Sequence, residues 1–231
     1  MRKSVLVALF LGACQPAPAP FLSQHEAIDL LIENGRVLDG LGSDAVEADV
    51  VVVGDRIVFV GETAFTEEDR SSRIQRTIDA NGRIVAPGFI DLHSHGDPLE
   101  TPELENFLAM GVTTITLGQD GSSPDVVPLS DWIGEVREKG IGTNLAMFVG
   151  HGTLRNQSGI GMAAPPEPED LERMGQMLDE ALDYTFGMSS GLEYNPGLNA
   201  DTNELRALAK IVGEHDRVIM SHMRNEDDDQ L

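Results

Sequence analysis

Two histidines separated by a single residue follow an apolar run in the segment Pro87-Gly88-Phe89-Ile90-Asp91-Leu92-His93-Ser94-His95. If this run is a strand, His93 and His95 share one face, because side chains on a strand alternate with a period of two. Two imidazoles on one face supply half of a tetrahedral metal site. A pair of ordinary surface histidines is the alternative, but it leaves the buried strand before them unexplained. We therefore predict that His93 and His95 are the first two ligands of a divalent cation.

The elements that must position these histidines follow Gly88, where strand-like and helix-like runs alternate. The candidate strands are 89–93, 113–117, 144–149, 185–189 and 217–221, and the clearest helical periodicity lies in 169–184 and 202–214. This alternation predicts a parallel sheet with its functional residues at the carboxyl ends of the strands. We therefore expect an α/β fold in which residues 88–231 form the first five or so βα units of an eightfold barrel. A complete barrel needs about 250 residues, so the barrel is expected to be partial.

Residues 27–87 have a different pattern of short β-rich runs separated by glycine turns, at Asn34-Gly35, Asp39-Gly40, Gly54-Asp55 and Asn81-Gly82. Asn-Gly and Asp-Gly between β-branched residues are strong hairpin signals. The pattern predicts a small antiparallel β domain ahead of the barrel.

The first residues have the features of an export signal. Arg2 and Lys3 precede the short apolar run 5–11, and Leu11-Gly12-Ala13-Cys14 resembles a bacterial lipobox, in which Cys14 is lipidated. We expect a lipoprotein signal peptide at 1–14 and a Pro-rich tether at 15–26. The protein is then exported and held on the periplasmic or cell-surface face of a bacterial membrane only through Cys14.

The formal net charge of −23 excludes a nucleic-acid partner, which requires a basic face.

The His93–His95 motif and the preceding β domain resemble the amidohydrolase superfamily. Three later motifs narrow this resemblance to the N-acyl-D-amino-acid deacylases, or D-aminoacylases: Gly150-His151-Gly152-Thr153-Leu154-Arg155, Gly187-Met188-Ser189-Ser190-Gly191-Leu192-Glu193-Tyr194-Asn195-Pro196-Gly197, and Ser221-His222-Met223-Arg224. These motifs occur in the family's order. The likeness covers residues 28–231 and corresponds to the N-terminal part of the family only.

The resemblance implies a metal site, most simply for zinc, with His93, His95, Asp120 and His222 as ligands. Asp120 stands where the family has a cysteine. A carboxylate can ligate zinc, but it is a harder ligand that accommodates other divalent ions. The alternatives are that Asp120 only shapes the turn before Gly121, and that His222 is a core histidine satisfied by the backbone.

The resemblance also implies a small-molecule substrate, an N-acyl amino acid, whose carboxylate is contacted by Tyr194 and Arg224. Tyr194 could equally pack against the barrel rim. Ser190 is a further candidate neighbour of the substrate, and His151 could either contact substrate or order its loop.

The implied reaction is hydrolysis of the linear amide in N-acyl-D-amino acids. The family's general base is an aspartate on the eighth strand, so no catalytic base is named here, and this stretch alone is expected to be inactive. Two alternatives stay open: a dihydroorotase- or hydantoinase-like enzyme acting on cyclic amides, and a non-catalytic, lipid-anchored binding protein with a partial metal site. The first uses a carboxylated lysine on the fourth strand, which segment 185–190 lacks.

Overall fold

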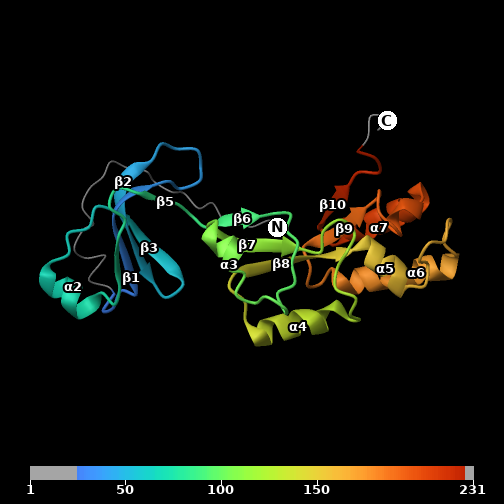
Figure 1. The fold of residues 1–231 in the computed structure, drawn as a ribbon, viewed down its shortest axis with the longest axis horizontal. Helices are drawn as coiled ribbons and strands as arrows, with labels where there is room; N and C mark the ends of the chain where they lie inside the picture. The colour runs from blue at the N-terminus through green and yellow to red at the C-terminus, as the bar shows by residue number, and fades with distance from the viewer. Residues whose placement is uncertain (1–24, 227–231) are drawn as a thin grey trace. The chain divides into compact units, whose positions relative to one another are not determined.

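The computed structural model of the chain describes residues 25–226, and the chain divides into two compact units between Pro87 and Gly88 (Figure 1). The expected signal peptide with Cys14, and nearly all of the tether, lie outside the described residues. No helix within residues 25–226 is long and apolar enough to cross a membrane.

The first unit is a small sheet with the strand order β3-β2-β1-β4, in which β5 also pairs with β1. Its elements are β1 (Leu30–Val37), β2 (Val46–Val53), β3 (Arg56–Gly61), α2 (Glu67–Arg73), β4 (Thr77–Asp79) and β5 (Ile84–Val85). A two-residue turn at Gly54-Asp55 joins β2 to β3, as the hairpin signal there predicts. Ile28, Leu31 and Val51 form its buried core.

The sheet is mixed, so the expectation that it would be wholly antiparallel is wrong in part. β1–β2 and β2–β3 pair antiparallel, but β4 and β5 both run parallel to β1. Helix α2 lies between β3 and β4 in the chain and allows the chain to return in the same direction as β1, which a tight hairpin cannot do.

Asn34-Gly35 is a bulge inside β1, where the pattern predicts a hairpin turn. Asn34 has φ +57°, and the pairing register with β2 shifts between Ile32 and Gly35. The Asp49 carboxylate accepts the Asn34 backbone N–H at 3.1 Å, so the irregular backbone is satisfied and the strand continues. A Cβ at Gly35 would lie 2.7 Å from a methyl carbon of Val85, so a larger side chain at this position would clash with Val85.

The second unit contains the parallel sheet that the sequence predicts, with the strand order β10-β9-β8-β7-β6. Its strands are β6 (Phe89–Asp91), β7 (Val112–Leu117), β8 (Asn144–Gly150), β9 (Gly187–Gly191) and β10 (Val218–His222). Neighbours in the sheet are neighbours in the chain, and every pair is parallel. This is the arrangement of successive βα units in a curling half-barrel, and it brings the carboxyl ends of all five strands to one edge.

The helices of this unit pack against the sheet, and buried side chains of both helices and strands form the core. They are α3 (Glu105–Ala109), α4 (Leu129–Lys139), α5 (His151–Gln157), α6 (Pro168–Ala181), a 3-10 turn η1 (Gly197–Asn199) and α7 (Thr202–Glu214). α5 packs on β8 and β9, and α7 packs on β10. The buried positions Met174, Leu178 and Ala181 in α6 follow the i, i+4, i+7 spacing that places apolar side chains on one helix face.

Candidate metal centre

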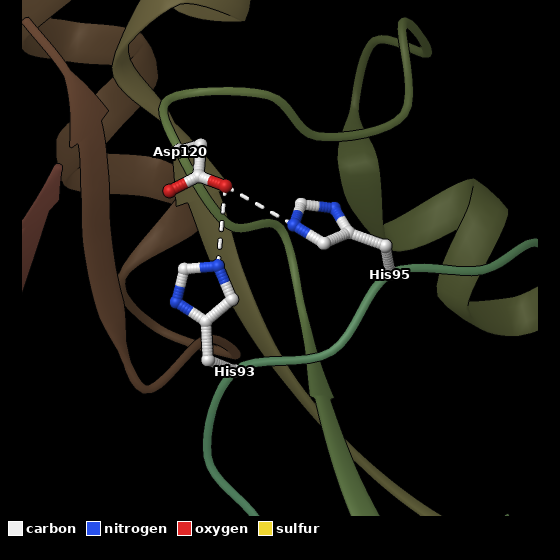
Figure 2. Close-up of side chains that lie close together, drawn as sticks. All are labelled: His93, His95 and Asp120. Carbon is white, nitrogen blue, oxygen red and sulfur yellow. Dashed lines mark hydrogen bonds and ion pairs between the residues drawn. The ribbon is translucent and has the colours of Figure 1, made fainter.

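The polar residues of the second unit gather at the carboxyl ends of β6, β7, β9 and β10. His93 and His95 follow β6, Asp120 follows β7, Glu193 and Tyr194 follow β9, and His222 ends β10. Figure 2 shows His93 and His95 projecting from one segment toward the carboxylate of Asp120. The parallel topology therefore assembles one polar cluster from residues up to 129 positions apart, counting from His93 to His222.

His93 and His95 lie just beyond the end of β6, on backbone that stays alongside β7. The Ser94 N–H donates to the Thr116 carbonyl at 3.1 Å, which extends the interstrand bonding past Asp91. Ser94 is buried while both histidines are exposed, so the side chains alternate as they would on a strand. The predicted i, i+2 geometry thus holds although the strand itself ends earlier than expected.

Asp120 lies in a tight turn after β7, with φ +53°, between Gly118 and Gly121. The backbone of this turn and the backbone of its neighbours approach so closely that only glycine fits at the points of contact. A Cβ at Gly118 would lie 1.9 Å from the Phe148 carbonyl oxygen, and one at Gly191 would lie 2.1 Å from that of Asp120. The Gly121 N–H also donates to Ser189 Oγ at 3.0 Å, so packing against β8 and β9 fixes the Asp120 carboxylate in place.

The three side chains converge on one oxygen. Asp120 Oδ2 lies 3.1 Å from Nε2 of His93 and 3.1 Å from Nε2 of His95 (Figure 2). Two ligands of one tetrahedral zinc ion, with bonds of about 2.0–2.1 Å, are separated by about 3.3 Å. The His93, His95 and Asp120 donor atoms therefore lie close to the spacing that a shared cation requires.

His222 lies on the opposite side of the same carboxylate. Its Nδ1 is 3.6 Å from Asp120 Oδ1, which is too long for an ordinary hydrogen bond. Its Nε2 is 3.1 Å from Glu193 Oε2 and 3.2 Å from Glu226 Oε1. Met220, Ser221 and Met223 complete a pocket whose wall also includes His93, Asp120, His222 and Glu226.

The carboxylates around His222 change its protonation. Its pKa lies above the ordinary value, chiefly because Glu193 accepts a hydrogen bond from the ring; the charges of Glu226 and Asp120 add to this effect, and desolvation opposes it. The pKa of Tyr194 is also raised, first by desolvation and then by the charge of Asp120. A proton and a cation therefore compete for the imidazole of His222.

The donor set fits a divalent cation. Asp120 Oδ1 is buried and has no hydrogen-bond partner among the residues that the structure describes. A buried carboxylate oxygen without a partner is costly, and a cation beside it would remove that cost. Imidazole and carboxylate are zinc ligands, so His93, His95 and Asp120 are suited to hold such an ion, with His222 facing the other carboxylate oxygen.

The predicted substrate contacts lie around this cluster, but their hydrogen-bond partners differ. The Tyr194 hydroxyl is 3.2–3.3 Å from the two ring nitrogens of His222. Arg224 donates to the carbonyls of Leu198 and Ala200 at 3.0 and 3.1 Å. Arg224 therefore ties the loop after β10 to the loop after β9.

Ser190 and His151 lie deeper in the unit. Ser190 is almost fully buried, and its hydroxyl donates to Ser221 Oγ at 2.8 Å. His151 is completely buried, and its Nε2 is 2.7 Å from the Glu204 carboxylate. The sequence left open whether His151 contacts substrate or orders its segment. Its burial against Glu204 at the start of α5 favours the ordering role.

Two residues of the cluster have no counterpart among the predicted site residues. Glu193 contacts His222, and Gln119 is buried beside Asp120, where its amide donates to the Leu92 carbonyl at 3.1 Å and holds the segment that leads into His93. Glu193 immediately precedes Tyr194, so its place in the β9 motif was the signal that could have identified it. Nothing in the sequence around Gln119 distinguishes it from an ordinary turn residue.

Comparison with known proteins places this fold and cluster in context. No protein-family model matches the chain. N-acyl-D-glutamate deacylase of Alcaligenes xylosoxydans xylosoxydans is 35% identical over 227 residues, which cover 88% of this chain and 45% of that protein. D-aminoacylase of the same organism is 28% identical over 230 residues, with 88% and 46% covered.

A solved structure shows the same similarity. The N-acyl-D-glutamate deacylase of Bordetella bronchiseptica, complexed with zinc and a phosphonate mimic of the tetrahedral intermediate, superimposes with a TM-score of 0.80 at 32% identity. The match covers 88% of this chain and 46% of that one. The chain thus spans less than half the length of the relatives that it matches.

Proposed function

We propose that this chain belongs with the N-acyl-D-amino-acid deacylases of the amidohydrolase superfamily, as the N-terminal part of such a protein, and that the complete protein hydrolyses N-acyl-D-amino acids with the help of a divalent cation. The observation that carries this proposal is the convergence of His93 and His95 on Asp120 at the carboxyl ends of the strands. Catalytic residues of βα barrels project from that edge.

The cluster supports the chemistry of amide hydrolysis. A bound divalent cation, most simply zinc, would polarise the acyl carbonyl and lower the pKa of a water molecule toward neutrality. His93 and His95 offer Nε2 lone pairs to such an ion, and the packed turn around Asp120 holds the carboxylate still while they do so. The general base is not assigned to any of residues 25–226.

The substrate is proposed to be a small N-acyl amino acid whose carboxylate lies near Tyr194 and Arg224. The Tyr194 hydroxyl contacts the His222 ring, and Arg224 follows His222 by two residues in the chain. A guanidinium can pair with a carboxylate through two parallel N–H donors. Arg224 would have to release its two backbone carbonyls, or share its donors, to make that pair.

A linear amide fits this chain better than a cyclic one. β9, the fourth strand of the sheet, reads Gly-Met-Ser-Ser-Gly and supplies no lysine for a carbamate bridge between two metal ions. The alternative of a cyclic-amide hydrolase therefore lacks the residue on which such enzymes depend.

A substrate panel tests the proposed function. The complete protein, freed of metal by a chelator and reloaded with Zn²⁺, is expected to hydrolyse N-acetyl-D-glutamate, N-acetyl-D-aspartate or N-acetyl-D-leucine, and to leave their L counterparts intact. Activity should disappear with the metal and return with it. The double variant H93N/H95N is the control that should stay inactive after reloading. Turnover of a hydantoin alone, or no turnover of any amide, would contradict the proposal.

We further propose that the protein is exported and anchored in a bacterial membrane through a lipid on Cys14. The support is the charged start, the apolar run and the Leu11-Gly12-Ala13-Cys14 junction. Mass spectrometry of the membrane fraction should find a diacylglyceryl group on Cys14, and C14S should release the protein from the membrane. Recovery of wild-type protein with an unmodified Cys14 would rule this anchor out.

A further inference from the structure

Glu193 and Asp120 contact different nitrogens of the same imidazole. Glu193 Oε2 is 3.1 Å from Nε2 of His222, while Asp120 Oδ1 is 3.6 Å from Nδ1. An ionised carboxylate only accepts hydrogen bonds, so the contact with Glu193 requires the proton to be on Nε2. When His222 is neutral, Nδ1 then carries the lone pair and points toward Asp120.

Nδ1, on the side of the ring that faces Asp120, has no carboxylate oxygen of residues 25–226 at ordinary hydrogen-bond distance. Asp120 Oδ1 is buried and has no hydrogen-bond partner within the described residues, and its separation of 3.6 Å from Nδ1 is close to that of two ligands sharing a cation, about 3.3 Å. The Tyr194 hydroxyl contacts both ring nitrogens almost equally, at 3.3 Å from Nδ1 and 3.2 Å from Nε2, so it does not select one tautomer of His222.

We propose that Glu193 is a positioning residue that fixes the tautomer and orientation of His222, so that Nδ1 and Asp120 Oδ1 can hold a cation between them. This inference rests on the proposed metal-dependent function. In metal sites, a ligating histidine usually donates its other ring N–H to a carboxylate, carbonyl or water, which sets the ring orientation and raises its basicity.

A direct role of Glu193 as a ligand is the competing arrangement, because Glu193, His222 and Glu226 also lie close enough to hold an ion. That arrangement uses Nε2 as the metal-binding nitrogen and leaves Asp120 Oδ1 buried without a hydrogen-bond partner in the described part of the chain. The Glu226 side chain is also 62% exposed, so it remains solvated without an ion. The unpaired oxygen therefore favours Nδ1 as the metal-binding nitrogen and Glu193 as its support.

Variants of Glu193 in the complete protein separate these roles. E193A is expected to weaken Zn²⁺ and Co²⁺ binding by about 10–100-fold, the usual cost of removing a partner of a ligating histidine. E193Q should retain most of the affinity, because its amide oxygen still accepts the Nε2 proton. E226A should cost much less affinity than E193A, because the Glu226 side chain is 62% exposed and Glu193 still accepts the Nε2 proton. D179A is the matched control, since Asp179 accepts from His215 at 2.8 Å in an ordinary carboxylate–histidine pair between α6 and the end of α7.

Nitrogen-15 NMR of His222 reads the tautomer directly and is independent of turnover. The wild-type ring should be protonated at Nε2 in the neutral metal-free protein, and Zn²⁺ should shift the Nδ1 resonance. E193A should give a mixture of tautomers, and E193Q should restore the wild-type form.

Three results would overturn the inference: protonation at Nδ1 in the wild type, an equal loss of affinity in E226A, or a change in the Co²⁺ absorption spectrum of E193Q that marks a lost ligand. If the predicted affinities and tautomer are observed but no N-acyl amino acid is hydrolysed, the proposed function fails and the role of Glu193 stands. If hydrolysis is observed and E193A binds Zn²⁺ normally, only the role of Glu193 fails.

Discussion

Removing the carboxylate of Asp120 is expected to lower kcat/KM of the complete protein by about 10³-fold or more, because the cation is worth several kcal/mol to the transition state and each 1.36 kcal/mol is a factor of ten. D120N is the variant of choice. Asparagine tolerates the left-handed backbone at φ +53°, so the turn survives while the charge is lost. The measurements are kcat/KM on the best D-amino-acid substrate and the zinc content of the purified protein.

D120C is the informative companion variant. A thiolate is a softer ligand than a carboxylate, so this variant should bind zinc again and favour thiophilic ions such as Cd²⁺ relative to Mn²⁺ more than the wild type does. Full metal content and activity in D120N would show instead that Asp120 only shapes the turn before Gly121.

The largest expected effect on stability comes from Glu204, which is fully buried at the start of α7. Its carboxylate pairs with Arg155 Nη1 at 2.7–2.8 Å and with His151 Nε2 at 2.7 Å, and both partners are also fully buried. Removing one member of a buried ionic group leaves the other charge uncompensated, at a cost of about 3–5 kcal/mol. E204L should lower the free energy of unfolding by that amount, measured by urea denaturation of the complete protein.

Two control variants define this prediction. K210A breaks the exposed pair between Lys210 and Glu214, 3.7 Å apart, and should change stability by less than about 1 kcal/mol. R155M/E204L should be more stable than E204L, since it removes the stranded charge as well as its partner. Equal losses in E204L and K210A would show that the buried group contributes no more than a surface pair.

Much of the architecture was predictable because local sequence patterns determine it. Apolar runs that alternate with helical stretches predicted all five strands of the second unit, and helical periodicity predicted α6 and α7. The spacing of His93 and His95 predicted that they would face the same way. The resemblance to the deacylases predicted Asp120 beside them, and the parallel strands, which end at the same edge of the sheet, bring it there.

The remaining features depend on contacts between segments that are distant in sequence. Asn34-Gly35 carries a strong turn signal, but the carboxylate of Asp49, fifteen residues away, allows the strand to continue. His151 follows a strand, as His93 and Asp120 do, yet Glu204 and Arg155 hold it in the core. Arg224 and Glu193 owe their geometry to loops that meet only in the folded unit. No sequence pattern encodes those pairings.

Anomalous X-ray diffraction at the zinc absorption edge, from crystals of the complete protein loaded with Zn²⁺, tests the metal centre most directly. We predict a peak about 2.0–2.2 Å from Nε2 of His93, Nε2 of His95 and Oδ2 of Asp120, the bond lengths of zinc to imidazole and carboxylate. A crystal of active, zinc-loaded protein with no peak within bonding distance of these three atoms would contradict the account.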